Sequence, residues 1–386
     1  MIIKFIFFLS YIFFISKILF KFGHPSHNSR LNSLTKGKKY IQKCLGGELI
    51  NNNNLNFYNT PKISVIIPLY NCEKTIKASI RSIQNQEMKE IEIILVNDYS
   101  SDNTSEIIKE LSLEDQRINI INNLKNMGTL YSRNIGILNS KGKYVINLDN
   151  DDLFFNNDIF DIFYKEAEEG NIDILGFAAI ESSTYYPLIT QMHDAYFQNH
   201  KNGLYLRQPE LTYFPFTKND KFRPNDYHVW GRFIKSNLYK KSINNLGISA
   251  IGEDRRIQYV IWSEDSSMSL ILFSLADSYK YIKIYGIFHY LSETTASNTR
   301  HIDQKLFGEI YFLDLMFDFT GNNYIGIKYV IDKAKEMRYD SYYNLDNRNN
   351  VLYYKAVIIK IINCEYISEK DKKKMEILYK SLLNVI

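Results

Sequence analysis

The sequence predicts an α/β fold: a Rossmann-like, mostly parallel sheet with helices on both faces, followed by a helical C-terminal extension. Short continuous apolar runs rich in β-branched residues are typical of strands that are buried on both faces. Segments of helical periodicity alternate with these runs, which favours parallel strands joined by crossover helices. Beyond residue 300 the pattern is mostly helical. The chain has 386 residues, which is enough to bury a sizeable core.

The first half of the chain alternates regularly between strand and helix patterns. Strands are expected at residues 63–68, 91–96, 117–121, 144–148 and 172–177. Helices are expected between and after them, at residues 73–86, 103–112, 129–139 and 158–169. Asn71 is the expected cap of the first helix, because its short polar side chain can accept a hydrogen bond from an unpaired backbone N–H.

The second half is less regular. Residues 181–225 are aromatic and rich in loop-forming residues. Helical patterns follow at residues 227–248 and 262–278, and a strand is expected at residues 281–290. Residues 300–386 read as mostly helical and contain no recognisable chemical motif.

Residues 1–22 are strongly apolar and are long enough to span a bilayer. A cleaved signal peptide is the competing interpretation, but no small-x-small cleavage site follows the apolar run closely. We therefore expect an uncleaved, single-pass N-terminal membrane anchor. Residues 23–60 are polar and are expected to form a tether that buries little of itself.

The orientation of this anchor stays open. Basic residues are denser after the apolar run than before it, which by the positive-inside rule favours a cytoplasmic body. Lys4 and the amino terminus also place positive charge on the other side, so a lumenal body is the alternative.

Composition argues against several classes of protein. The formal net charge is only +4, and the chain has no Lys/Arg-rich block, so nucleic acid is not an expected partner. The three cysteines, Cys44, Cys72 and Cys364, are widely spaced and odd in number. They are expected to be free thiols rather than a disulfide framework or a zinc site.

The acidic run at residues 149–152 follows the fourth expected strand directly. Ligands of open α/β sheets bind at the carboxyl ends of the strands, and hard cations prefer carboxylate and phosphate oxygens. Asp149 and Asp151 therefore form a candidate D-x-D site for Mg²⁺ or Mn²⁺. An EF-hand is excluded, because Phe154 stands where that loop needs glycine. The competing interpretation is an acidic loop that caps the next helix at Asp158.

Two further candidates lie near strand ends. Asp98 follows the second strand, and its carboxylate could accept a hydrogen bond from the imide N–H of a uracil ring. Its surroundings could equally serve to cap the following helix. Arg133 lies on an otherwise mostly apolar helix and could reach a base or a phosphate, although a surface salt bridge is the simpler interpretation.

A candidate general base comes much later in the chain. Asp265, in a Glu-Asp pair at an expected helix start, is preferred, and Glu253-Asp254 is the competing pair. His289 could be a third metal ligand, but a satisfied histidine near the core is the preferred account. The glycine-rich fingerprints for dinucleotides and for P-loops are absent, because the first strand is followed by PLYN.

Taken together, these segments resemble the family 2 glycosyltransferases, which have the GT-A fold. The resemblance extends over about residues 63–298 and is strongest through residue 177. It is carried, in order, by ISVIIPLYN at 63–71, EIILVNDYSSDNT at 92–104, SRNIG at 132–136, GKYVINLDNDD at 142–152 and WSEDSSMSLILFSLADSY at 262–279.

The resemblance implies a role for each candidate residue. Pro68 and Tyr70 would wall the nucleotide base, and Asp98 would contact the uracil. Arg133 would occupy the donor-side arginine position.

In the acidic run, Asp149 and Asp151 would be the D-x-D pair, with Asp151 the direct metal ligand and Asp149 also reaching the ribose or sugar. Asp265 would be the general base. One departure concerns Tyr99, since the family often has glycine between the aspartate and serine that correspond to Asp98 and Ser100.

The implied activity is metal-assisted transfer of a sugar, with inversion, from a nucleotide-diphosphate donor to an acceptor hydroxyl. A UDP-sugar is the expected donor, and the enzyme would be a hexosyl- or N-acetylhexosaminyltransferase acting on a glycan, lipid or protein. Residues 61–180 would bind the nucleotide sugar, residues 181–300 would bind the acceptor and supply the base, and residues 301–386 would form the helical extension. The alternatives are a catalytically silent nucleotide-sugar-binding protein and a nucleotidyltransferase.

Overall fold

The computed structural model describes eleven segments of the chain, namely residues 27–48, 59–182, 193–194, 202–213, 217–218, 221–222, 228–246, 264–290, 302–320, 324–339 and 348–383. Within these segments, no helix combines the length and the apolarity that crossing a membrane requires. The apolar segment at residues 1–22 lies outside the described residues, as does the competing Glu253-Asp254 pair.

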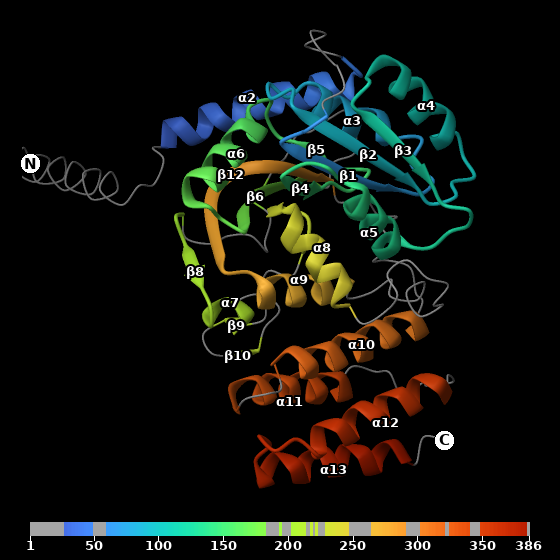
Figure 1. Cartoon of the computed structure of the whole chain (residues 1–386), viewed down its shortest axis with the longest axis vertical. Helices are drawn as coiled ribbons and strands as arrows, with labels where there is room; N and C mark the ends of the chain where they lie inside the picture. Colours follow the sequence, from blue (N-terminus) through green and yellow to red (C-terminus); the bar gives the residue numbers. More distant parts are fainter. Residues whose placement is uncertain are drawn as a thin grey trace, which may run out of the picture.

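A large mixed sheet lies in the upper part of the molecule in Figure 1, with the C-terminal helices below it. Its main path runs β3-β2-β1-β4-β11-β6-β12-β5, and β7 and β8 add to β6 and β12. The strands of the main path are β1 (Ile63–Leu69), β2 (Ile91–Asn97), β3 (Ile118–Asn122), β4 (Tyr144–Asn147), β5 (Leu153–Phe154), β6 (Ile174–Ser182), β11 (Arg232–Lys235) and β12 (Ser278–Tyr290). The short strands are β7 (His193–Asp194), β8 (Tyr205–Arg207), and the separate pair β9 (Thr217–Lys218) and β10 (Lys221–Phe222).

Helices cover both faces of this sheet, which confirms the predicted fold class. The helices of the sheet region are α2 (His27–Leu45), α3 (Ile76–Gln84), α4 (Thr104–Glu114), α5 (Thr129–Asn139), α6 (Ile159–Gly170), α7 (Glu210–Tyr213), α8 (Ser236–Asn244) and α9 (Glu264–Leu275). Strands β1, β2, β3 and β4 are mutually parallel, as continuous apolar runs predict. β11 is antiparallel to both of its neighbours, β4 and β6.

Alternate residues of each strand enter two different cores. Val65 and Ile67 of β1 pack on the face that α3, α4 and α6 cover. Ile66 packs on the opposite face, with residues of α5, α8 and α9. Because such strands have apolar residues on both faces, polar side chains are placed at the strand ends. The functional site is therefore expected at the ends of the strands.

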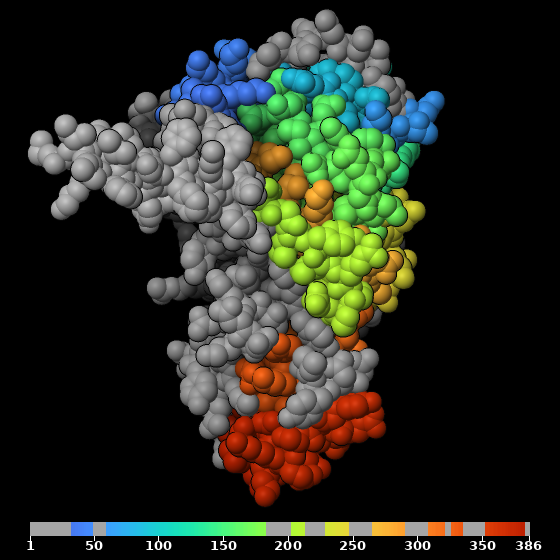
Figure 2. Space-filling model, turned by 90° about the vertical axis from the view of Figure 1, so that its left-hand side faces the viewer, coloured from blue at the N-terminus to red at the C-terminus, as the bar shows by residue number. Residues whose placement is uncertain are grey.

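Four helices form the C-terminal extension, at the end of the molecule away from α2 (Figures 1 and 2). They are α10 (Ile302–Thr320), α11 (Tyr324–Tyr339), α12 (Arg348–Ile362) and α13 (Glu369–Leu383). α10 packs on α9, and the Tyr311 hydroxyl donates a hydrogen bond to the carbonyl of Leu246. The helical pattern read from residues 300–386 is therefore confirmed.

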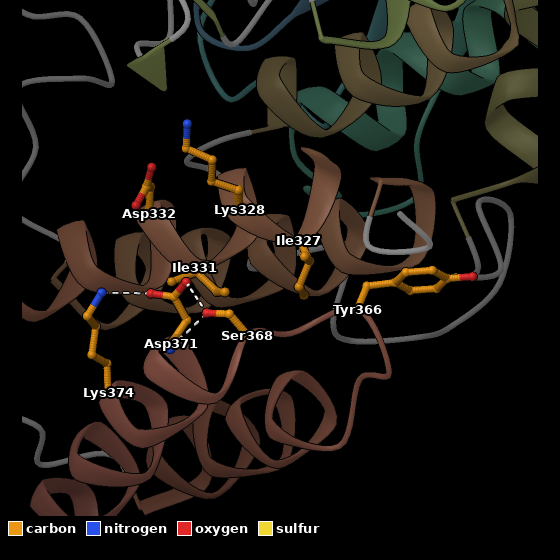
Figure 3. A pocket seen from close by; sticks show the side chains of 8 residues that line it. All are labelled: Ile327, Lys328, Ile331, Asp332, Tyr366, Ser368, Asp371 and Lys374. Atoms are coloured by element: carbon orange, nitrogen blue, oxygen red, sulfur yellow. Dashed lines mark hydrogen bonds and ion pairs between the residues drawn. The ribbon is translucent and has the colours of Figure 1, made fainter. Parts of the chain in front are cut away.

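A small open pocket of about 230 Å³ lies within this extension (Figure 3). Its lining residues are Ile327, Lys328, Ile331, Asp332, Tyr366, Ser368, Asp371 and Lys374. Asp371 accepts hydrogen bonds from Ser368 and Lys374, so part of its charge is balanced within the pocket. No residue predicted for a functional site lies here.

The expectation that residues 23–60 bury little of themselves is wrong for residues 27–45. These residues form α2, which packs on α3. Tyr40, Ile41 and Cys44 of α2 are buried, and the Tyr40 hydroxyl donates a hydrogen bond to the carbonyl of Ser82. Only a few apolar residues of α2 are buried, and most of its residues are polar. The average composition of the segment therefore did not predict a packed helix.

Two local predictions are also corrected. The segment predicted as one helix from residue 227 begins instead with β11 and becomes helical only at α8. The N-cap of α3 is Thr75 rather than Asn71. Asn71 adopts a left-handed conformation with φ +48° and cross-links two loops at the carboxyl edge of the sheet.

Candidate active site

The acidic run forms a turn just after β4, at the carboxyl edge of the parallel strands. The backbone N–H of Asp152 donates to the carbonyl of Asp149 at 3.1 Å and closes the turn. The Asn150 side chain donates to the carbonyl of Pro68 at 3.3 Å, and Ser79 donates to the carbonyl of Asn150 at 2.9 Å. The turn is therefore fastened to β1 and α3, as the strand-end position predicts.

Arg133 connects this turn to the distant Glu-Asp segment. Its guanidinium donates from Nη2 to Oδ1 of Asp149 at 3.3 Å and from Nη1 to Oδ1 of Asp265 at 3.2 Å. Arg133 is 3% exposed, whereas the two carboxylates keep 30% and 17% of their side chains exposed. The structure thus brings Arg133, Asp149 and Asp265 together around a single buried cation.

The two carboxylates on Arg133 differ in proton affinity. Burial raises the pKa of Asp149, and the guanidinium of Arg133 lowers it by less, so the pKa is raised overall. Burial also opposes ionisation of Asp265, but Arg133 and the neighbouring His228 outweigh it, so the pKa of Asp265 is lowered. Asp265 is therefore ionised at neutral pH and can accept a proton.

The pKa of Asp151 shows the effect of the neighbouring negative charges. Burial, followed by the charges of Asp152 and Asp149, raises the pKa of Asp151 to about 7. A carboxylate in this state is stabilised by a nearby cation.

Asp152 belongs to a different interaction. The register of β5 on β12 pairs Leu153 with Phe288, which brings Asp152 opposite His289. Nδ1 of His289 lies 2.8 Å from Oδ1 of Asp152, whose side chain is fully buried. Burial lowers the pKa of His289, but the carboxylate of Asp152 outweighs it and raises this pKa to about 9. His289 is thus the satisfied histidine that the sequence favours.

Sequence reasoning missed a group of rings between these two carboxylate sites. Nδ1 of His228 lies 3.7 Å from Oδ2 of Asp265. The ring of Trp230 packs against His228, with centroids 5.1 Å apart, and stacks on His289 at 4.9 Å. The sequence signal for this group is the Trp-Gly-Arg run at residues 230–232, which lies inside the range 227–248 predicted as a helix.

Asp98 lies where the sequence places it, after β2, but its carboxylate has protein partners. Oδ1 accepts hydrogen bonds from the Asn123 side chain and from the backbone N–H of Met127, each at 2.7 Å. Oδ2 accepts one from the backbone N–H of Gly128 at 2.8 Å. Asp98 thereby fixes the loop that leads into α5, which carries Arg133.

Pro68 is buried at the end of β1, whereas Tyr70 is 51% exposed in the loop that follows. Tyr99 follows Asp98 and is 62% exposed. Both tyrosines thus lie in loops at the carboxyl ends of the parallel strands, where the acidic turn also lies.

The acidic turn suits a divalent cation that is completed by phosphate oxygens. In the described part of the chain, no group of three or more His, Cys, Asp or Glu side chains forms a complete metal site. Mg²⁺ and Mn²⁺ commonly take only one or two carboxylates in addition to substrate phosphates. The raised pKa values of Asp149 and Asp151 agree with a site that lacks positive charge.

Comparison with known proteins identifies the domain. Residues 64–246 match the sequence model of Glycosyl transferase family 2. The uncharacterized glycosyltransferase EpsJ of Bacillus subtilis is 30% identical over 224 residues, which cover 57% of this chain and 58% of EpsJ. A GalNAc(5)-diNAcBac-PP-undecaprenol beta-1,3-glucosyltransferase of Campylobacter jejuni is 35% identical over 122 residues, 31% of this chain and 39% of that enzyme. The chain thus spans less than two thirds of the length of each of these relatives.

The fold has solved counterparts. The crystal structure of S. aureus TarS 1-349 in complex with UDP superposes with a TM-score of 0.57 at 14% sequence identity, covering 84% of this chain and 88% of TarS 1-349. This likeness concerns the fold, which is GT-A. The sequence match to Glycosyl transferase family 2 is confined to residues 64–246, which hold most of the central sheet and the candidate site residues other than Asp265.

Proposed function

We propose that this protein transfers a sugar from a nucleotide-diphosphate donor to an acceptor hydroxyl, with inversion at the anomeric carbon. The observation that carries the proposal is the shared guanidinium of Arg133, which holds Asp265 and Asp149 together across 132 and 16 residues of sequence. An ionised carboxylate then faces the acidic turn where the diphosphate would bind.

The chemistry follows from this arrangement. An acceptor hydroxyl attacks the anomeric carbon while Asp265 takes its proton. The new C–O bond forms as the bond from the anomeric carbon to the diphosphate oxygen breaks, and the nucleoside diphosphate leaves with that electron pair. Asp265 alone supplies the base, because a single displacement needs no covalent intermediate. The lowered pKa of Asp265 keeps it ionised for this step.

Asp149 and Asp151 would hold Mn²⁺ or Mg²⁺ at the acidic turn. When bound, the cation supplies positive charge to the leaving diphosphate. Asp152 is committed to His289 and is not assigned to the metal.

For the donor, we propose a UDP-sugar whose base lies near Pro68, Tyr70 and Asp98. The crystallised complexes of TarS with UDP and with UDP-GlcNAc support this at the level of the fold. The Asp98 carboxylate already accepts three hydrogen bonds. A carboxylate can accept about four, so one site is left for an imide N–H.

Hexosyl or N-acetylhexosaminyl transfer to a glycan, lipid or protein is the proposed reaction class. The C. jejuni relative, a glucosyltransferase whose name contains a PP-undecaprenol-linked glycan, supports a hexose and a glycan or lipid-linked acceptor. The apolar composition of residues 1–22 supports a membrane anchor.

A donor screen with the purified full chain tests the proposal. UDP-, GDP-, CDP- and dTDP-sugars are incubated with and without Mn²⁺, and nucleotide release is followed with an acceptor mixture of undecaprenyl-linked and free glycans. Sugar-dependent release that requires Mn²⁺ and the acceptor is the expected result. Binding of a nucleotide sugar without turnover would favour the silent binding protein, and incorporation of a nucleotidyl group would favour the nucleotidyltransferase.

A further inference from the structure

The loops that follow β1 and β2 each carry an exposed tyrosine. The parallel register places Leu69 opposite Asn97 at the end of both strands. Tyr70 follows the first strand and Tyr99 the second, with 51% and 62% of their surfaces exposed. Both rings are therefore open to a ligand that binds at the carboxyl ends of the strands.

Tyr99 is held in an unfavourable backbone conformation. Its φ is +64°, the left-handed region that bulky L-residues rarely enter. Glycine would adopt this conformation at no steric cost, and the chain nevertheless carries a tyrosine here. Strain of this kind is often retained where it positions a functional side chain.

The loops around both tyrosines are cross-linked and hold this conformation. Ser101 donates its backbone N–H to Oδ1 of Asn71 at 2.8 Å, and Asn71 donates its own N–H to Oγ of Ser100 at 3.1 Å. The N–H of Ser100 donates to the Asn97 side chain at 3.2 Å. Each loop therefore fixes the other, which presents the two rings in a pre-organised arrangement.

The position of the rings favours the nucleobase over the acceptor. In the sheet, β1 lies between β2 and β4, and β11 lies on the other side of β4. Asp265 approaches from that other side, where it meets His228 just before β11. A donor whose diphosphate lies at the turn after β4 can extend its nucleoside over β1 and β2, away from the base that activates the acceptor.

We propose that Tyr99 is a base-contacting residue of the donor site, whose ring stacks on the nucleobase together with Tyr70. The inference rests on the proposed function and adds a contact that the family glycine at this position cannot make. Stacking of a base on an aromatic ring contributes enough free energy to change affinity about tenfold.

The test separates backbone strain from ring contact. Tyr99→Gly removes both, and Tyr99→Asn removes the ring while tolerating the left-handed conformation. Tyr99→Phe keeps the ring, and Tyr366→Ala removes an exposed tyrosine of the C-terminal extension as a matched control. Binding of UDP, GDP, CDP, dTDP and ADP to the full chain is measured by calorimetry with Mn²⁺, and Tm is measured for each variant.

For the nucleotide that the parent protein binds most tightly, Tyr99→Gly and Tyr99→Asn are expected to weaken affinity about tenfold. Tyr99→Phe and Tyr366→Ala should stay within twofold. Tm of Tyr99→Gly should equal or exceed that of the parent, because its backbone strain is relieved. If Tyr99→Gly and Tyr99→Asn bind this nucleotide within twofold of the parent affinity, the role of Tyr99 is overturned, but the proposed function is not. Failure of the parent to bind any of the five nucleotides would overturn the proposed function and this inference with it.

Discussion

At the scale of single residues, the site is organised by Arg133, which shares one guanidinium between two carboxylates. Asp149 belongs to the predicted donor site and Asp265 is the predicted base, so their link places donor and base in one arrangement. The sequence spacing does not predict that Arg133 binds both carboxylates. This link arises because α5, β4 and α9 meet at one edge of the sheet.

Replacing Arg133 should change the proton affinity of Asp265. In Arg133→Met, the lowered pKa of Asp265 loses its principal cause, so this pKa rises. The rate of sugar transfer falls as pH drops through that pKa, so we expect this acid limb to move to higher pH. Arg133→Lys keeps a charge and should shift the limb less. The pH–rate profiles of the three proteins are the measurement, and coincident acid limbs would contradict the role of Arg133.

The pair of His289 and Asp152 should be a stability element. Because the pKa of His289 is raised to about 9, above 6.5, its contribution is fully present below pH 6.5 and lost as pH rises through about 9. His289→Gln leaves a buried carboxylate uncompensated and should cost about 3 kcal/mol at pH 6, with a smaller cost at pH 9.5. Urea unfolding at both pH values checks this.

The double variant Asp152→Asn with His289→Gln is the control for this pair. Removing both charges should recover much of the loss at pH 6, because no buried charge is left unpaired. A double variant as unstable as His289→Gln would mean that packing of the ring, rather than charge, provides the stability.

At the scale of elements, the sequence predicted most of the first half. The apolar runs give β1 and β2 to within a residue, and α5 has the predicted bounds. These elements bury their own periodic side chains, so local pattern and global fold agree. β11 escaped prediction because four residues, RFIK, are defined as a strand only by pairing with β4 and β6.

The helix α2 gives an element-scale prediction. Ile41 is completely buried between α2 and the body of the protein, so Ile41→Ala should cost about 2–4 kcal/mol of unfolding free energy. Gln42→Ala, at an exposed position of the same helix, should change it by less than about 0.5 kcal/mol. Chemical denaturation of the two variants is the measurement. Equal unfolding free energies for the two variants would mean that this segment is a tether, as the sequence predicted, and that α2 does not stabilise the fold.

At the scale of the whole molecule, the fold concentrates negative charge at one edge of the sheet and leaves it short of compensation. The sequence predicted that edge and the carboxylates on it, since strand ends follow from apolar runs. It did not predict which carboxylate meets which cation. Asp152 and His289 are 137 residues apart, and only the register of β12 on β5 brings them together.

This excess charge predicts how stability depends on pH without metal. Folding raises the pKa of Asp151 to about 7. As pH rises, Asp151 therefore loses its proton at a lower pH in the unfolded chain than in the folded protein. The stability of the parent protein should therefore fall, relative to Asp151→Asn, between about pH 4 and pH 7 and stay constant above. A rise of this pKa from 3.8 to about 7 corresponds to a relative change of about 4 kcal/mol, which we expect in EDTA. Asp277→Asn, at an exposed position, is the control. Parallel pH profiles for parent and Asp151→Asn would contradict the raised pKa.

The most direct test of the account is the turnover of Asp265→Asn with the best donor from the screen. Removing the base while keeping the side-chain shape should lower kcat at least about 100-fold and leave the affinity for the nucleoside diphosphate within about threefold. Asp277→Asn should retain full activity. A kcat for Asp265→Asn within twofold of the parent value would contradict the assignment of the base and the mechanism built on it.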